Sequence, residues 1–241
     1  MDFLVVIRSA LHTSLLQAQK TGRITPNDYN IAMEICSNVV YNSILDRFEE
    51  TSEVSDDVAP FVVTMGTPDY PPLAVDSFGY AIKPADYVRR VQAGNKVYVS
   101  TGCGTAAERK YRKVVFLPID TFKTAMQSTL YKPTAKRIIA CMENDKIRFA
   151  PAGLFDNVEF TYIKKAVAPF YDYNLSASGL EVFLPKGSFH DGTNLPAGTP
   201  SRTEPILFNT TTLYPFYQDL LKYFAIPVEA SVQLQTLNLS A

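Results

Sequence analysis

The stretch that most constrains the fold runs from residue 137 to residue 169 and holds three short segments of β-strand character. Residues 137–143, 146–150 and 158–164 are rich in apolar residues, and in the second and third segments these alternate with polar ones. Alternation with a period of two buries one face of a sheet and leaves the other in water. Asn144 and Asp145, which separate the first two segments, tolerate the backbone of a tight turn. The sequence therefore predicts an antiparallel β-meander.

Amphipathic helices are expected on both sides of the meander. Apolar residues recur at three- and four-residue steps over residues 2–19, 25–48 and 211–224, a spacing typical of helices with one buried face. Thr25 and Pro26 are the residue types that favour the N-cap and the first position of the second helix. The short link between the first two helices predicts a helical hairpin. Further helices are expected at 118–130 and, shorter, at 85–91.

The remaining stretches have the composition of connections. Residues 49–57 are acidic and predict a linker or mobile loop. Residues 59–84 are rich in proline and predict irregular, extended backbone. Residues 172–205 are rich in Gly, Pro, Ser and Thr, and a loop of this length in a compact domain is usually functional or disordered.

The predicted fold class is α+β: an N-terminal helical hairpin and a C-terminal helix packed with a small antiparallel β-meander, with long extended loops. We expect one domain over residues 1–241. Its parts are the hairpin at 2–48, a mixed β core at 80–169, an extended excursion at 172–205, and a helix and tail at 211–241.

Charge is distributed unevenly along the chain, although the net charge is only −1. Residues 1–79 carry a net charge of −7, residues 80–137 of +9, and residues 138–241 of −3. The small total gives no global reason to bind nucleic acid or an anionic membrane. Two interpretations of the uneven distribution remain open. Faces of opposite sign either pair within one molecule or fix the register between copies arranged head to tail.

Residue types that carry chemistry are few. The 3 cysteines have no close spacing, which argues against a disulfide framework and a zinc site and fits a reducing compartment. Cys103 lies between glycines, but a thiolate nucleophile needs a base, and neither His12 nor His190 lies in a recognisable motif. A turn is the favoured interpretation of that loop. We therefore expect no catalytic residue, no cofactor and no metal.

A basic run over residues 109–113 admits two interpretations. Arg109, Lys110, Arg112 and Lys113 are able to contact a nucleic acid backbone, whereas the alternation of the segment favours one solvent-exposed strand face. The chain has no run of 18 apolar residues, so no membrane span is expected. Its first residues lack the positive charge of a signal peptide. We expect synthesis in a cytoplasm, and use there or in a particle assembled there.

Several segments together resemble a known family. These are G-R-I-T-P-N-D-Y-N at residues 22–30, N-D-K-I-R-F-A-P at 144–151, V-E-F-T-Y-I-K-K-A-V-A-P at 158–169, and a terminal helix with a short coda at 213–239. In these segments the chain is similar to virion structural proteins of crAss-like and related podovirus-type phages. Family members look like ring or adaptor proteins of the head-to-tail connector. The chain departs from the family after Pro169, where relatives reach the last helix through a short strand ending in F-E-L-H-P.

The resemblance implies a non-enzymatic subunit of a homo-oligomeric ring, twelvefold like the portal above it. The implied partners are the portal protein, neighbouring ring or tail proteins, and genomic DNA that passes through the channel without sequence-specific contacts. The implied location is the virion, after synthesis in the host bacterial cytoplasm. The residues expected at contacts between subunits are Arg109, Lys110, Arg112, Lys113, Glu49, Glu50, Phe189 and Arg202.

Two alternatives remain. One is a DNA-binding packaging accessory protein that uses the basic residues 80–137. The other is a cytoplasmic enzyme that depends on Cys103.

Overall fold

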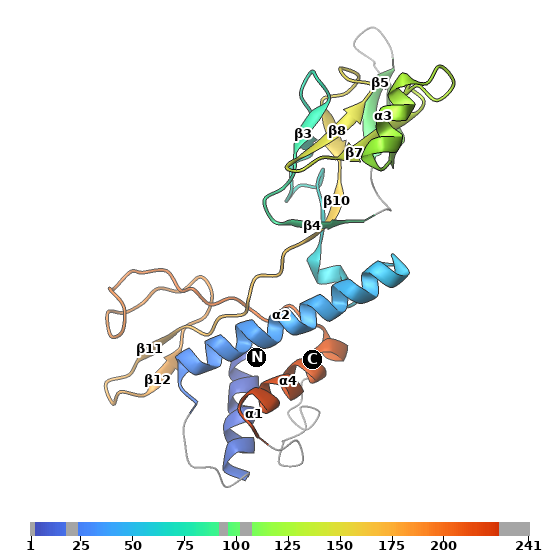
Figure 1. Cartoon of the computed structure of the whole chain (residues 1–241). Helices are drawn as coiled ribbons and strands as arrows, with labels where there is room; N and C mark the ends of the chain where they lie inside the picture. The colour runs from blue at the N-terminus through green and yellow to red at the C-terminus, as the bar shows by residue number, and fades with distance from the viewer. Residues whose placement is uncertain (1–2, 18–23, 92–95, 102–107, 227–241) are drawn as a thin grey trace. The chain divides into compact units, whose positions relative to one another are not determined.

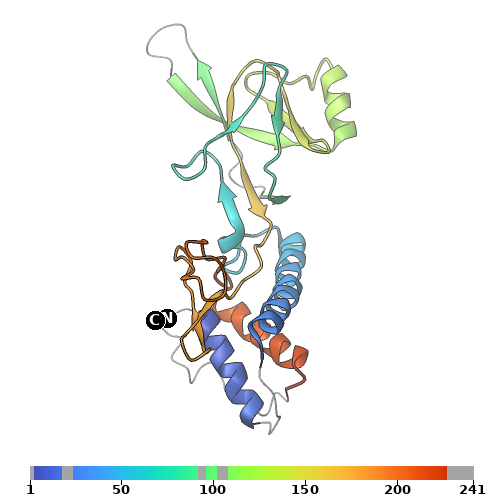
Figure 2. The same ribbon diagram turned by 90° about the vertical axis from the view of Figure 1, so that its left-hand side faces the viewer.

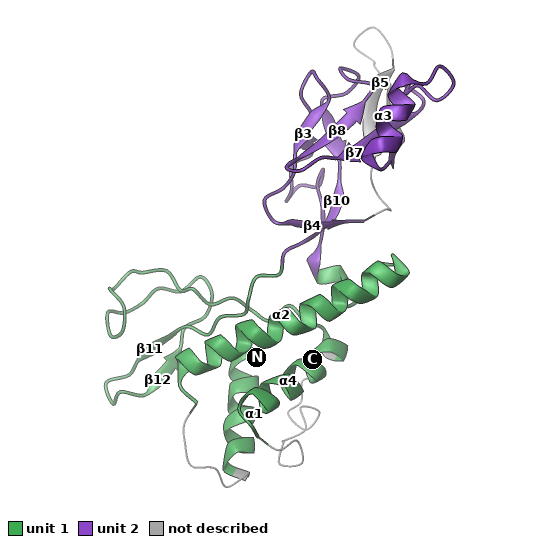
Figure 3. Cartoon of the chain, in the orientation of Figure 1, with its two compact units in different colours: residues 1–60, 166–241 green, residues 61–165 purple. Residues whose placement is uncertain are grey.

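The chain forms two compact units in the computed structural model, which describes residues 3–17, 24–91, 96–101 and 108–226. Unit 1 comprises residues 1–60 and 166–241, and unit 2 comprises residues 61–165 (Figure 3). Helices and mostly antiparallel sheets confirm the predicted α+β class (Figure 1). The sequence predicted a single domain. The structure differs because residues 61–165 are inserted between two helical parts and bury their apolar strands in a core of their own.

Unit 1 is built on α1 (Phe3–Gln17), α2 (Pro26–Thr51) and α4 (Thr210–Tyr223), and α2 packs against α4 (Figure 1). Thr25 is the N-cap of α2, as predicted, and its side chain accepts a hydrogen bond of 3.2 Å from the backbone N–H of Asp28. Asn209 is the N-cap of α4 and accepts from the N–H groups of Thr211 and Thr212 at 3.1 and 3.0 Å.

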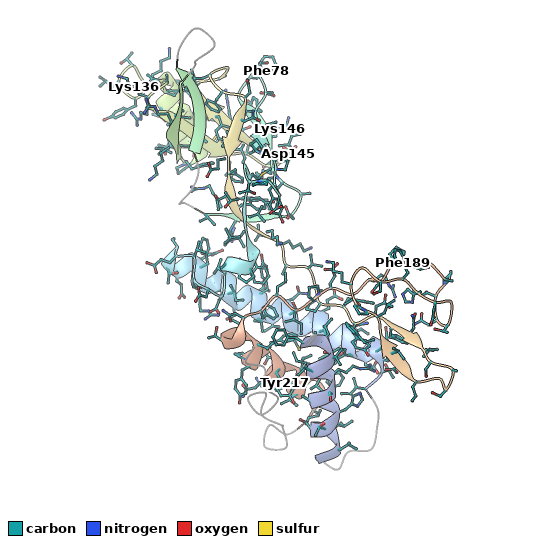
Figure 4. The ribbon with its side chains drawn as sticks, turned by 180° about the vertical axis from the view of Figure 1, so that it is seen from behind. Phe78, Lys136, Asp145, Lys146, Phe189 and Tyr217 are labelled. Carbon is teal, nitrogen blue, oxygen red and sulfur yellow. The ribbon has the colours of Figure 1, made fainter. Side chains whose placement is uncertain are left out.

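Buried tyrosines connect the helices of unit 1 through their hydroxyl groups. The Tyr29 hydroxyl on α2 donates to the carbonyl of Leu4 on α1 at 2.9 Å. The Tyr217 hydroxyl on α4, labelled in Figure 4, is 3.0 Å from the Ser14 hydroxyl on α1. Because each buried hydroxyl has a partner, the aromatic rings fill the core without leaving a polar group unsatisfied.

Unit 2 contains a seven-stranded sheet in the order β2-β9-β5-β6-β7-β8-β3 and a three-stranded sheet in the order β1-β10-β4. The strands are β1 (Val62–Thr64), β2 (Leu73–Ala74), β3 (Tyr80–Ile82), β4 (Tyr87–Arg90), β5 (Lys96–Thr101), β6 (Glu108–Phe116), β7 (Ile138–Met142), β8 (Lys146–Ala150), β9 (Asn157–Glu159) and β10 (Thr161–Lys164). All named pairs are antiparallel except β6 and β7, which α3 (Ile119–Gln127) connects.

The large sheet curls so that its end strands, β2 and β3, meet at the turn between them (Figure 2). In this turn the backbone N–H of Asp76 donates to the carbonyl of Tyr80 at 2.8 Å. Gly79 has a φ of +86°, and a Cβ at this position would lie 2.5 Å from the carbonyl oxygen of Phe149. Glycine is therefore required by both the backbone conformation and the close approach of β8.

Two apolar clusters lie on opposite faces of the curled sheet. Ile147 and Phe149 on β8 and Phe160 face the larger cluster, which contains thirteen buried residues. Ile139 and Cys141 on β7 face the other way and pack with Phe122 on α3. The 0% exposure of Ile139 and Cys141 shows that the outer face of β7 is covered, so α3 gives unit 2 a second layer.

The meander is confirmed in its first two strands, and its third strand is divided. The predicted 146–150 strand has the observed bounds of β8, and the turn at Asn144 and Asp145 is closed by the N–H of Glu143 donating to the carbonyl of Lys146 at 2.9 Å. The predicted 158–164 strand is split between β9 in the large sheet and β10 in the small sheet. Thr161, expected on a wet face, is 6% exposed because the chain changes sheets immediately before it.

Two local predictions in unit 2 are wrong. Residues 85–91, expected as a short helix, contain β4, and residues 59–84, expected to be irregular, supply β1, β2 and β3. The hydroxyl of Tyr162 donates to Asp86 at 2.8 Å, and β4 pairs with β10. These tertiary contacts override the local helix-start pattern at Pro84 and Ala85.

Candidate interaction surfaces

The basic residues predicted at a contact lie on β6, in a two-stranded ribbon. β5 and β6 pair from Lys96↔Lys113 to Thr101↔Glu108, whereas β5 pairs with β9 only at Lys96 and Val97, and β6 pairs with β7 only from Val114 onward. The outer part of the β5–β6 pair therefore extends beyond the sheet as a ribbon (Figure 2). Ribbons of this kind present backbone and side chains on two sides to a partner.

Two of the four basic residues of the ribbon have described side chains. Lys113 is exposed, and Arg112 is half-buried. Arg112 precedes Val114 by two positions, so it lies on the same strand face as this core residue. The side chains of Arg109 and Lys110 lie outside the described residues, so one solvent-exposed basic face stays a prediction.

The predicted acidic contact residues lie at the end of α2. Glu49 and Glu50 belong to its last turn and are exposed, so the linker predicted at 49–57 begins as helix. Ser52 ends the helix with a φ of 56°. The stretch after it is anchored by Asp57, whose Oδ2 lies 3.1 Å from Arg47.

Asp57 also joins this end of α2 to the N-cap of α4. Its Oδ1 accepts from the Asn209 side-chain amide and from the Thr211 hydroxyl, each at 2.6 Å. Burial acts to raise the pKa of Asp57, but the hydrogen bonds from Thr211 and Asn209 and the charge of Arg47 outweigh it and lower this pKa below its usual range. The charged carboxylate is thus the form that the fold stabilises.

The excursion at 172–205 is held around a buried pair of side chains, Asp172 and His190. It contains the hairpin of β11 (Tyr173–Leu175) and β12 (Glu181–Phe183). Asp172 and His190 are 1% and 2% exposed, and Oδ2 of the aspartate lies 3.0 Å from Nε2 of the histidine. The other ring nitrogen of His190 lies 2.8 Å from Oδ1 of Asn174. His190, which lies in no recognisable sequence motif, is the centre of a polar cluster.

Backbone groups complete this cluster. The N–H groups of Tyr173 and Arg202 donate to the Asp172 carboxylate at 3.1 and 2.8 Å. The His190 N–H donates to the carbonyl of Thr199 at 2.8 Å. Buried polar groups with full sets of partners fix one conformation, because any other arrangement would leave them unsatisfied. The expected structureless loop is therefore an ordered segment.

The two contact residues predicted in the excursion lie on its surface. Phe189 is 63% exposed, next to the buried His190, and Figure 4 shows it on the outer part of the segment. The Arg202 guanidinium lies over the ring of Phe170, 4.9 Å from its centroid, and its Nε lies 3.9 Å from Asp172. Phe189 is thus available for a partner, while Arg202 also has an internal role.

Arg8 on α1 makes a buried ion pair in unit 1, with Glu181 on β12. Its guanidinium lies 4.5 Å from the ring centroid of Tyr171, and it borders an open cavity of about 330 Å³. The Nε atom of Arg8 has no hydrogen-bond acceptor among the described residues. The pair joins the excursion to the helices, and no signal in the sequence pointed to it.

The described cysteines are poor nucleophiles. Burial, together with the charge of Asp219, raises the pKa of the Cys36 thiol to about 11. Burial also raises the pKa of Cys141. Both thiols therefore stay protonated at neutral pH. Cys103, the residue of the enzyme alternative, lies outside the described residues.

The described residues contain no group of three or more His, Cys, Asp or Glu side chains placed to share a metal ion. None of their helices combines the length and the apolar character needed to cross a bilayer.

Charge separates sharply between the two units. Unit 1 has 7 Lys and Arg against 15 Asp and Glu, and unit 2 has 16 against 9. Their net charges are therefore −8 and +7.

Protein-family models and curated protein sequences give no match to the chain. The physical properties of the two units carry the functional argument.

Proposed function

We propose that this protein is a structural subunit of a phage head-to-tail connector, which assembles with copies of itself into a ring beneath the portal and around the DNA channel. The observation that supports this best is the separation of charge, −8 in unit 1 and +7 in unit 2. Each copy then offers the next a surface of opposite sign, which favours association head to tail. A head-to-tail contact whose rotation closes makes a ring.

The connector role rests on the segments that resemble phage ring and adaptor proteins. The ordered cores of the two units suit a subunit that has to set a fixed angle to its neighbours. The β5–β6 ribbon and the exposed Phe189 are the features that would reach a neighbouring subunit. The portal and other ring or tail proteins are the proposed partners, and DNA passes through the ring without being read. The proposed location is the virion.

The experiment reverses the four basic charges of the ribbon, with the variant R109E/K110E/R112E/K113E. We expect the variant to stay folded, with a far-ultraviolet circular dichroism spectrum like that of the wild type, and to lose ring formation in electron micrographs. The control K146E/K165E reverses two exposed lysines of unit 2 that lie outside the ribbon, and should still form rings. Rings of normal size from the ribbon variant would remove the electrostatic role of these residues.

A DNA-binding packaging accessory protein is the second candidate. Unit 2 has a net charge of +7, and residues 121–142 contain four Lys or Arg and no Asp or Glu. A protein that neutralises phosphates binds DNA with an affinity that falls steeply as salt is added. Binding of the isolated protein to duplex DNA at 50 mM salt, lost at about 200 mM, would favour this candidate over a ring subunit.

The enzyme alternative requires a reactive Cys103. Labelling with a thiol-reactive probe at pH 7 distinguishes a Cys103-dependent enzyme from a structural subunit. Slow labelling, at the rate of an ordinary thiol, supports a structural role, whereas rapid labelling that a C103S variant loses supports catalysis.

A further inference from the structure

Two surfaces, one on each unit, combine exposed apolar side chains with charges of a single dominant sign. The first is the loop between α3 and β7, residues 128–137, which we call the basic loop. The second is the solvent-facing side of α2 from residue 28 to residue 50, which we call the acidic face.

The basic loop has an apolar tip. Leu130 is 85% exposed, the highest value of any large apolar residue described, and Tyr131 is 59% exposed. Lys132, Lys136 and Arg137 are exposed around them, and Figure 4 labels Lys136. No acidic residue occurs between positions 121 and 142. An exposed apolar patch with a polar rim is typical of an interaction site.

The basic loop has a defined shape. The N–H and carbonyl groups of Thr134 and Arg137 bond to each other at 3.0 Å in both directions. The N–H of Tyr131 donates to the Ser128 hydroxyl at 3.0 Å, and the Arg137 guanidinium lies 5.1 Å from the Tyr131 ring centroid. Figure 1 shows the loop, in yellow-green, standing out beside α3. A preformed loop loses little conformational freedom when it binds.

The acidic face has the complementary character. Ile31, Ile35 and Val39 follow one another at four-residue steps on α2 and are 42%, 46% and 55% exposed. Residues four apart are neighbours on a helix, so the three side chains form one apolar stripe about 12 Å long. The exposed acidic residues on the same side of the helix are Asp28, Glu34, Asp46, Glu49 and Glu50.

Basic side chains are scarce on this part of α2. The one cation of the helix, Arg47, is exposed as well, and it pairs with Asp57 at 3.1 Å. The acidic face thus combines an apolar stripe with carboxylates. The stripe is complementary to the apolar tip of the basic loop, and the carboxylates are complementary to its cations.

We propose that the basic loop of one copy docks on the acidic face of α2 in the next copy, with Leu130 and Tyr131 against the apolar stripe and the lysines opposite the carboxylates. This inference rests on the proposed self-assembly and identifies one contact within it. Leu130 and the isoleucines form the desolvated centre, and the charges at the edge select the partner and its register. Loop and face belong to different units, so the contact is heterologous and propagates from copy to copy.

Duplex DNA is the less favoured occupant of the basic loop. Phosphates would match the lysines, but a leucine with 85% of its surface exposed has no partner on a phosphate backbone. A second copy matches both the apolar and the charged part of the loop.

The experiment uses two double reversals in the full chain. The loop variant is K132E/K136E, and the face variant is E34K/E50K. Each places like charges opposite each other and should raise the concentration for half-assembly, measured by analytical ultracentrifugation, by at least about tenfold. The control K146E/K165E makes the same change in net charge as the loop variant and should assemble like the wild type.

Charge exchange tests whether the two surfaces meet. A mixture of the loop and face variants should assemble, because each variant's changed surface is complementary to a surface of the other. The quadruple variant K132E/K136E/E34K/E50K should likewise assemble alone. L130S keeps every charge, so it should weaken assembly by a factor that does not change with salt concentration. It replaces a charge-reversal variant as the test of the contact if that variant fails to fold.

The outcomes separate this inference from the proposed function. Normal assembly of both double variants would overturn the proposed contact but not the proposed ring. The contact is also overturned if each double variant loses assembly and neither the mixture nor the quadruple variant recovers it. A wild-type protein that stays monomeric overturns both proposals. This holds even if the basic loop and the acidic face meet within one chain. Loss of DNA binding in the loop variant alone, with assembly unchanged, assigns the loop to nucleic acid instead.

Discussion

Replacing Asp172 with alanine should release the excursion at 172–205 from its fixed conformation. The carboxylate is 1% exposed and accepts from His190 and from the backbone N–H groups of Tyr173 and Arg202. Its removal leaves three donors without an acceptor. Each unsatisfied buried donor costs about 1–3 kcal/mol. Because the two amides are only partly buried, we expect a loss of about 3–5 kcal/mol rather than the sum of the upper values.

Hydrogen exchange followed by mass spectrometry measures this loss where it occurs. The backbone N–H groups of His190 and Leu184 donate to the backbone carbonyls of Thr199 and Asp172. Both N–H groups should exchange about 10² to 4 × 10³ times faster in D172A. D172N keeps one acceptor oxygen and loses the charge, so it should fall between the wild type and D172A. Protection in D172A within about 0.5 kcal/mol of the wild type would refute the view that this pair organises the segment.

Three further predictions concern single contacts. N209A removes the N-cap of α4 and should lower the free energy of unfolding of unit 1 by about 1–2 kcal/mol in urea titrations. D57N should be less stable than the wild type at pH 7, and the difference should shrink as the pH falls below the ordinary carboxyl pKa of about 3.9, because a lowered carboxyl pKa gives stability only while the group is charged. G79A places a Cβ 2.5 Å from the Phe149 carbonyl at a φ of +86° and should lower the melting temperature of unit 2, whereas G153A, at a φ of +70° and with its Cβ 3.8 Å from the Ser77 carbonyl, should lower it less.

Local patterns in the sequence predicted the elements whose stability is decided locally. β8 has the predicted bounds because Ile147 and Phe149 alternate with Lys146 and Arg148, and Asn144-Asp145 forms the turn. Thr25 caps α2 because an N-cap depends on the residue and its neighbours three positions along. These features need no knowledge of the rest of the chain.

Features that depend on distant residues were missed. Asp172 and His190 are 18 positions apart in a segment without periodicity, so nothing in the sequence pairs them. The same composition of Gly, Pro, Ser and Thr that suggested disorder supplies the hydroxyl and backbone groups that hold the excursion. Thr203, for example, donates to the carbonyl of Leu184 at 2.6 Å.

The division of charge was visible in the sequence, but its placement was not. The basic middle of the chain pointed to residues 109–113, whereas the structure adds the loop at 128–137, where Leu130 and Lys136 share one exposed surface. On α2 the apolar residues Ile31 and Ile35 are 42% and 46% exposed. Which side of a helix faces water depends on its neighbours, and those neighbours come from unit 1 residues far along the chain.

The mass and symmetry of the purified protein test the central claim most directly. Native mass spectrometry and negative-stain electron microscopy on one sample measure both, with and without the portal. For a subunit of 26.8 kDa, a twelvefold ring has a mass of about 320 kDa, and we expect a single closed species of that size. A monomer that persists at high concentration and in the presence of the portal would contradict the claim.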